Sequence, residues 1–153
     1  MSHAMRRTSI LLFISVIPLI MACSSTEGQG SGGLEPVVSA PQIVDGFMCA
    51  GVFEDKPVGI DNDFWLDDLV YIWLTWENMN GTHEVKIIWV DPGDDVYETK
   101  KSYSSQDGKL TTYFWLDTTS TAKAGEWLAE VYLDGIFVRS YSFWLNSVNM
   151  MNL

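Results

Sequence analysis

Apolar and polar positions alternate in short runs along residues 47–145. A period of two places the apolar side chains on one face of a strand, as in a sheet packed on a core. The runs are rich in Val, Ile, Thr and aromatic residues, which favour strands. The pattern predicts seven strands: Phe47–Glu54, Leu69–Glu77, His83–Val90, Val96–Tyr103, Leu110–Leu116, Glu126–Leu133 and Ile136–Leu145.

Turn residues separate these runs, and no segment keeps a 3.6-residue period, so no long helix is expected. Seven short strands in about 100 residues predict an all-β fold, a single antiparallel β-sandwich of immunoglobulin-like type. The sharpest turn is Asp134-Gly135, because two residues between apolar runs fit a type I′ hairpin. The predicted turns are Asn80-Gly81, Asp91-Pro92-Gly93, Asp107-Gly108 and Asp134-Gly135.

The last two predicted strands resemble a known hairpin. The segment Gly125–Gly135, followed by Phe143, is similar to the terminal hairpin of bacterial immunoglobulin-like and fibronectin-like domains. In those domains a Gly-x-Trp strand turns at Asp-Gly and returns to an inward Phe. Trp89 and the Pro92-Gly93 turn resemble the middle strand and turn of the same group. The resemblance covers about 60 residues, implies the sandwich fold and names no activity.

The N-terminal residues have the pattern of a secretory signal peptide. Arg6 and Arg7 precede an apolar run over Ile10–Met21, which is too short for a membrane span of about 20 residues. The run ends in Ile20-Met21-Ala22-Cys23, which resembles the lipobox of bacterial lipoproteins. The resemblance implies that Cys23 becomes the first mature residue, with diacylglycerol on its sulfur and an acyl chain on its amine. The alternative is an ordinary cleaved leader that leaves Cys23 as a thiol.

The segment after Cys23 is rich in Gly, Ser and Pro and has no hydrophobic period. Such a segment buries too little surface to offset its ordering entropy, so we expect a flexible tether. A chain of 153 residues suits one domain. The predicted parts are a signal peptide (1–22), the lipidated cysteine and tether (23–45), the sandwich (46–148) and a C-terminal tail (149–153).

Two of the predicted strands carry more aromatic surface than a small core needs. Leu69–Trp76 is apolar on both faces, and Tyr113–Leu116 repeats this feature. Either a loop or the tether covers the excess, or an aromatic patch is exposed for a partner. The candidate binding residues are Tyr71, Trp73, Tyr113 and Trp115.

Acidic residues gather between Asp55 and Asp68 and again between Asp91 and Asp95. Carboxylate oxygens are the hard ligands that calcium prefers. The EF-hand pattern is missing, however, and acidic loops are usually just solvated. No metal site is therefore assigned, and the weak calcium candidates are Asp61, Asp63, Asp67 and Asp68.

Charge and residue usage argue against nucleic-acid binding and against most enzyme classes. The net charge of -11 repels phosphate backbones. His83 is the only histidine after the leader, which excludes a multi-histidine metal site, and it is expected to be an ordinary surface residue. Cys49 is expected to act as a small buried hydrophobe. No phosphate loop or haem motif occurs, so the only expected attached group is the lipid on Cys23.

Together these features predict a non-enzymatic lipoprotein, held at a membrane by its lipid and binding another protein of the cell envelope. Ser24 after the lipidated cysteine implies the outer membrane if the cell is Gram-negative. The alternative is a carbohydrate-binding module with a structural calcium, in which exposed Trp73, Trp115 or Trp144 stacks on sugar rings. A flat row of Trp rings would favour sugar, and a mixed patch would favour protein.

Overall fold

The computed structural model of the chain describes residues 39–119 and 122–147. These residues form nine strands and no helix, and the strands belong to one compact unit. No helix among them is long and apolar enough to cross a membrane. The strands are β1 (Gln42–Phe53), β2 (Lys56–Ile60), β3 (Asp63–Trp65), β4 (Leu69–Glu77), β5 (Gly81–Val90), β6 (Val96–Ser105), β7 (Leu110–Asp117), β8 (Gly125–Leu133) and β9 (Ile136–Asn146).

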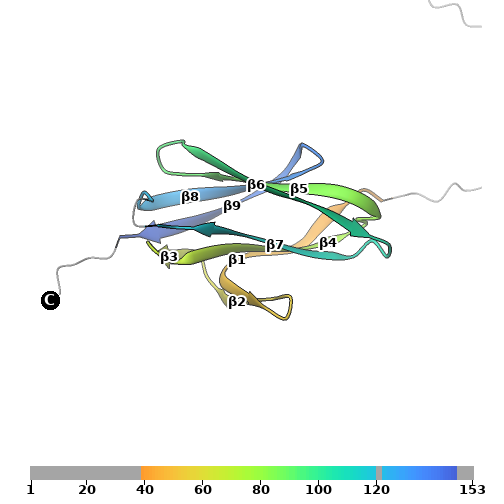
Figure 1. The fold of residues 1–153 in the computed structure, drawn as a ribbon, viewed down its shortest axis with the longest axis horizontal. Coiled ribbons are helices and arrows are strands. Elements are labelled where there is room, and N and C mark those ends of the chain that lie inside the picture. The colour runs from red at the N-terminus through yellow and green to blue at the C-terminus, as the bar shows by residue number, and fades with distance from the viewer. Residues whose placement is uncertain (1–38, 120–121, 148–153) are drawn as a thin grey trace, which may run out of the picture. The chain divides into compact units, whose positions relative to one another are not determined.

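The strands form two sheets that lie in two layers (Figure 1). One sheet has the order β2-β1-β4-β7 and the other has the order β3-β9-β8-β5-β6. Only β3 and β9 pair in parallel. With β1, β4 and β7 as strands A, B and E, and β6, β5, β8 and β9 as C′, C, F and G, this is the arrangement of an immunoglobulin-like sandwich. The predicted fold class is therefore confirmed.

All seven predicted strands are present, and the predicted turns lie between them, except that Gly81 of the Asn80-Gly81 turn is already the first residue of β5. The turn between β8 and β9 has positive φ at both central residues, 49° at Asp134 and 82° at Gly135, as a type I′ hairpin requires. The structure adds two short strands, β2 and β3, in the segment for which the sequence predicts only an acidic loop.

The first strand begins inside the predicted tether. The sequence predicts a tether up to residue 45, whereas β1 begins at Gln42 and continues through Asp45 and Gly46 with a bulge. The hydroxyl end of Tyr141, from the other sheet, lies where a side chain at residue 46 would lie, so a glycine fits this strand position. The predicted signal peptide (1–22), Cys23, the tether up to residue 38 and the tail (149–153) lie outside the described residues.

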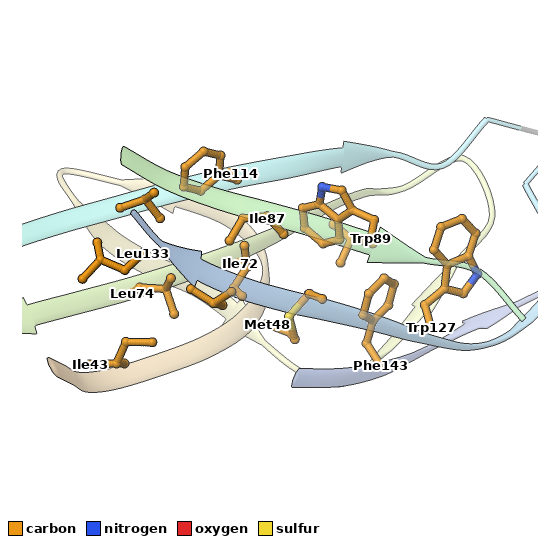
Figure 2. Packing of buried hydrophobic residues seen from close by; sticks show 14 of the residues in the cluster. Ile43, Met48, Ile72, Leu74, Ile87, Trp89, Phe114, Trp127, Leu133 and Phe143 are labelled. Carbon is orange, nitrogen blue, oxygen red and sulfur yellow. The ribbon is translucent and has the colours of Figure 1, made fainter. Parts of the chain in front are cut away.

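The core lies between the sheets and is built from alternating positions of the strands (Figure 2). The Trp127 ring is only 2% exposed and stacks on Phe143, with ring centroids 6.2 Å apart. Its Nε1 donates to the carbonyl of Lys123 at 2.9 Å, so the buried indole has a hydrogen-bond partner. The alternating apolar positions of β5 and β8 face this core, and all of them are buried: Val85, Ile87, Trp89, Trp127, Ala129, Val131 and Leu133.

A buried carboxylate holds the turn between β5 and β6. Oδ1 of Asp91 accepts hydrogen bonds from the backbone N–H groups of Gly93 (2.7 Å) and Asp95 (2.9 Å). The Lys123 ammonium lies 2.8 Å from the other Asp91 oxygen and 2.8 Å from Asp95. The ammonium and these N–H groups lower the pKa of Asp91, and the two carboxylates raise the pKa of Lys123. The carboxylates of Asp91 and Asp95 are thus engaged by the chain itself.

Candidate functional site

The outer face of the β2-β1-β4-β7 sheet gathers aromatic side chains from three strands. Strand register places Phe47 opposite Trp73, and Trp73 opposite Tyr113. In the next row of the same face, Tyr71 lies opposite Trp115. Side chains at directly opposed positions of neighbouring strands are in contact range. The four candidate residues named from the sequence therefore lie on one face, two on β4 and two on β7.

Trp73 is buried, contrary to the expectation that it is exposed on this face. Its side chain is 9% exposed and stacks on Phe47, with ring centroids 6.0 Å apart. Its Nε1 donates to the carbonyl of Asp55, at the tip of the β1–β2 hairpin, at 2.7 Å. The hairpin lies on the outer side of the sheet (Figure 1). For Trp73, therefore, the other alternative from the sequence analysis applies: a loop covers part of the aromatic excess.

The remaining aromatic residues reach the surface. Trp115 is 54% exposed and Tyr113 is 39% exposed, while Tyr71 is half-buried beside Trp115, with ring centroids 6.1 Å apart and planes inclined by 37°. We call Phe47, Tyr71, Tyr113 and Trp115 the aromatic face. Further exposed apolar residues of the same sheet are Val44, Phe53, Val58, Ile60 and Leu69.

A groove of about 490 Å³ adjoins the aromatic face where the edges of the two sheets meet. We call it the β6/β7 groove. Tyr103 of β6 and Phe114 of β7 meet edge-on in its lining, with ring centroids 6.3 Å apart. Tyr113 and Trp115 belong both to the groove and to the aromatic face. Its lining consists of Thr99, Lys100, Lys101 and Tyr103 together with residues 111–115.

The structure does not bring the calcium candidates together. The Asp61 carboxylate accepts hydrogen bonds from the backbone N–H groups of Asn62 (2.7 Å) and Asp63 (3.1 Å). The Asp68 carboxylate accepts one from the N–H of Trp65 at 2.8 Å. No group of three or more His, Cys, Asp or Glu side chains suited to a metal occurs among the described residues. Asp61, Asp67 and Asp68 thus lie in the turns on either side of β3, and Asp63 is the first residue of that strand.

Cys49 and His83 are both engaged in the packing and hydrogen bonding of the domain. The Cys49 side chain is fully buried, as predicted, and burial raises the pKa of its thiol. It pairs in register with Tyr71 on β4 and with Ile60 on β2, so it lies where the β1–β2 hairpin joins the rest of the sheet. His83 is not an isolated surface residue. Its Nδ1 lies 2.7 Å from the carboxylate of Asp134, so it connects β5 to the turn between β8 and β9.

Two further exposed tryptophans lie at the edge of the other sheet. Trp144, named from the sequence as a sugar-stacking candidate, is 47% exposed, and Trp65 is 54% exposed. Both line a shallow pocket of about 380 Å³ beside β3 and β9. Trp65 was not singled out from the sequence, because it belongs to an apolar run of only three residues inside the acidic segment.

A comparison with protein-family models finds no match, and neither does a comparison with curated proteins. Among solved structures, the chain resembles the Pseudomonas fluorescens alkylpurine DNA glycosylase AlkC bound to DNA containing an abasic site analog, with a TM-score of 0.52 and 13% identity. That likeness covers 69% of this chain and only 30% of the glycosylase. An immunoglobulin-like protein from Pseudomonas aeruginosa aligns at a TM-score of 0.46 and 16% identity, over 72% of this chain and 99% of that one. The likeness to the glycosylase concerns the fold alone.

Proposed function

We propose that this chain is a non-enzymatic, lipid-anchored protein of the bacterial cell envelope whose sandwich domain binds another protein through the aromatic face. The exposure of Tyr113 and of Trp115, which lies beside Tyr71, carries the proposal. Exposed clusters of large apolar side chains mark interaction sites. Tyr and Trp are also the residues that most often dominate the binding energy of protein interfaces.

The make-up of the aromatic face favours a protein over a sugar. It mixes Phe, Tyr and Trp, and the rings of Tyr71 and Trp115 are inclined by 37°. Exposed aliphatic residues, among them Leu69 and Ile60, extend it. Stacking on a sugar ring calls for a flat aromatic platform, whereas a mixed aromatic and aliphatic surface is typical of the centre of a protein interface.

The envelope location rests on the sequence of the N-terminal segment. The lipobox around Cys23 supports a lipid anchor, and several acyl chains hold a protein at a membrane far more firmly than a single chain does. Ser24 supports the outer membrane in a Gram-negative cell. Without a leader and anchor, the same domain would have no reason to meet an envelope partner.

A carbohydrate-binding function is the second candidate, and one observation favours it. Trp65 and Trp144 are both about half exposed and line the same shallow pocket at the β3–β9 edge. They belong to the opposite sheet from the aromatic face. A sugar site would therefore use different residues, and the two functions are separable by mutation.

Photo-crosslinking of the full chain in its own envelope tests the protein-binding proposal. With a benzophenone amino acid in place of Phe47, we expect a protein adduct whose yield falls about tenfold or more in Trp115→Ser, since an aromatic anchor contributes about 2 kcal/mol or more. Trp144→Ser is the matched control and should leave the yield unchanged. An adduct indifferent to Trp115→Ser would contradict the proposal, and lost retention on polysaccharide resin in Trp144→Ser would favour the sugar site.

The lipid anchor is tested separately in the same cells. We expect labelled fatty acid to be incorporated into the chain and the chain to partition into the detergent phase. Cys23→Ser should abolish both, because the sulfur that carries the diacylglycerol is removed. Cys49→Ser is the control and should keep the label, because that thiol is buried inside the domain. Labelling that survives Cys23→Ser would contradict the proposal that Cys23 carries the lipid.

A further inference from the structure

Free strand edges invite pairing with another chain, and proteins usually protect them with short strands, lysines, prolines or bulges. The described sandwich has four edge strands, β2, β3, β6 and β7. The first contains Pro57 and Gly59, the second spans only three residues, and the third carries Lys100 and Lys101. Eight-residue β7 (Leu110–Asp117) contains no lysine, proline or glycine. Among these edges, β7 alone has none of the protective features.

The β6/β7 groove follows this unprotected edge. It is lined by residues 111–115 of β7, so an extended chain lying in it would run beside the free backbone of that strand. Tyr103 and Phe114 supply an apolar lining for side chains that point inward. Trp115 and Tyr113 meet those that point outward. In sandwiches of the constant immunoglobulin type a strand D pairs with strand E at this place, and the described residues supply no such strand.

Charge in the groove indicates the chemistry of the occupant. Lys100 and Lys101 both line it, in a chain whose net charge is -11. The Lys100 ammonium lies 3.3 Å from Glu98. The Lys101 ammonium lies 5.1 Å from the ring centroid of Tyr103 and pairs with no carboxylate of the described residues. A carboxylate on an incoming chain would complement it.

We propose that β7 binds an extended, acidic segment of the partner protein as an added strand in the β6/β7 groove. Apolar residues of that segment alternate with Asp or Glu. Backbone hydrogen bonds to β7 supply affinity, and side-chain contacts with Lys101 and Trp115 supply selectivity, as in other strand-addition complexes. A second copy of this chain is a poorer occupant because two chains of the same large net charge repel each other. The inference rests on the proposed protein-binding function.

The test uses the full chain in detergent and two fluorescein-labelled synthetic peptides of eight residues. One alternates Val or Ile with Glu, and the other has Lys in place of every Glu. We expect the acidic peptide to bind at least about tenfold more tightly by fluorescence anisotropy. In hydrogen exchange, its binding should slow the amides of β7 and leave those of β2 unchanged, since only new backbone hydrogen bonds to β7 protect them.

A charge reversal tests the role of the groove lysine. Lys101→Glu should weaken binding of the acidic peptide about tenfold at low salt. Lys56→Glu makes the same charge change on exposed β2, away from the groove, and should weaken it less than about twofold. Equal losses in the two variants would overturn the acidic assignment of the partner segment.

The remaining outcomes separate this inference from the proposed function. Peptide binding without protection of the β7 amides would overturn strand addition. If the Phe47 adduct still depends on Trp115, that result would leave the aromatic face as a binding surface. Protection of the β7 amides in the chain alone, rising with its concentration, would show that a second copy occupies the edge and would also overturn the proposal.

Discussion

Among single residues, Trp127 is one whose ring packs the last two strands, β8 and β9, against the core. It stacks on Phe143, which in turn meets Trp89 edge-on, with centroids 6.2 Å apart in each pair. Deleting a buried large aromatic side chain removes transfer free energy and leaves a cavity. Trp127 is therefore one end of a chain of three buried rings, and its removal should affect the packing of the other two.

We expect Trp127→Ala to lower the free energy of unfolding by roughly 3 to 5 kcal/mol, the usual cost for a buried large aromatic. Trp144→Ala is the control, since that ring is 47% exposed, and it should cost less than about 1 kcal/mol. Urea unfolding followed by fluorescence measures both. A loss below about 1 kcal/mol in Trp127→Ala would show that the ring does not fill the core.

At the scale of elements, the β1–β2 hairpin buries side chains that would otherwise be exposed on the outer face of its sheet. Trp73 and Cys49 lie on the outer side of their sheet, yet both are buried, because the hairpin covers that side. Gly59 in this hairpin has φ of +64°, and a Cβ there would lie 3.1 Å from the Cβ of Ala50. The hairpin thus depends on a glycine at this position.

Thiol accessibility reports whether the hairpin is in place. Cys49 should react very slowly with a thiol reagent in the native protein, because the thiol is buried and burial raises its pKa. We expect Gly59→Val to speed this reaction about tenfold or more, since the strained backbone loosens the cover. Gly51→Val is the control, because a side chain there has open space and an ordinary φ. Equal reaction rates in the two variants would mean that β2 does not shield the thiol.

Element prediction from the sequence succeeded where the strands are long and failed where they are short. Most of the longer strands carry a period of two or a continuous apolar run, whereas β6 is largely polar and stands between two turn segments. Strand β2 contains Pro57 and Gly59, which suggest a turn, and β3 has too few residues to show any period. The candidate residues Tyr71, Trp73, Tyr113 and Trp115 were predicted on β4 and β7, with exposure or cover by a loop left open, and Trp73 is the covered one. Its cover comes from an element with no strand pattern of its own.

The stability of the whole domain is expected to depend on pH through the pair His83 and Asp134, which links the start of β5 to the β8–β9 turn. The Asp134 carboxylate raises the pKa of His83 above its ordinary value of 6.5, and His83 lowers the pKa of Asp134 below its ordinary value of 3.8. The contribution of His83 to the free energy of unfolding is therefore fully present below pH 6.5, and it is lost as the pH rises through the raised pKa. The aspartate contribution is complete above pH 3.8 and is lost as the pH falls through the lowered pKa.

Thermal or urea unfolding at pH 5.5 and pH 8.5 checks this dependence. We expect the free energy of unfolding to decline by at most about 1 kcal/mol between these values through this pair, because the pair is partly solvent-exposed and therefore screened. His83→Gln should reduce that decline, since the titrating group is gone. An unchanged decline in His83→Gln would assign the pH dependence to other groups.

The order of the strands also has a mechanical consequence. Strands β1, β4 and β7 are neighbours in one sheet, and both pairs are antiparallel. An anchor before β1 and a partner strand along β7 would pass any pull between membrane and partner across this sheet alone. If the pull ran along the strands, the hydrogen bonds of each ladder would carry the load together instead of breaking one after another. The domain would then act as a tension-bearing link, and the core and the second sheet would carry little of the force.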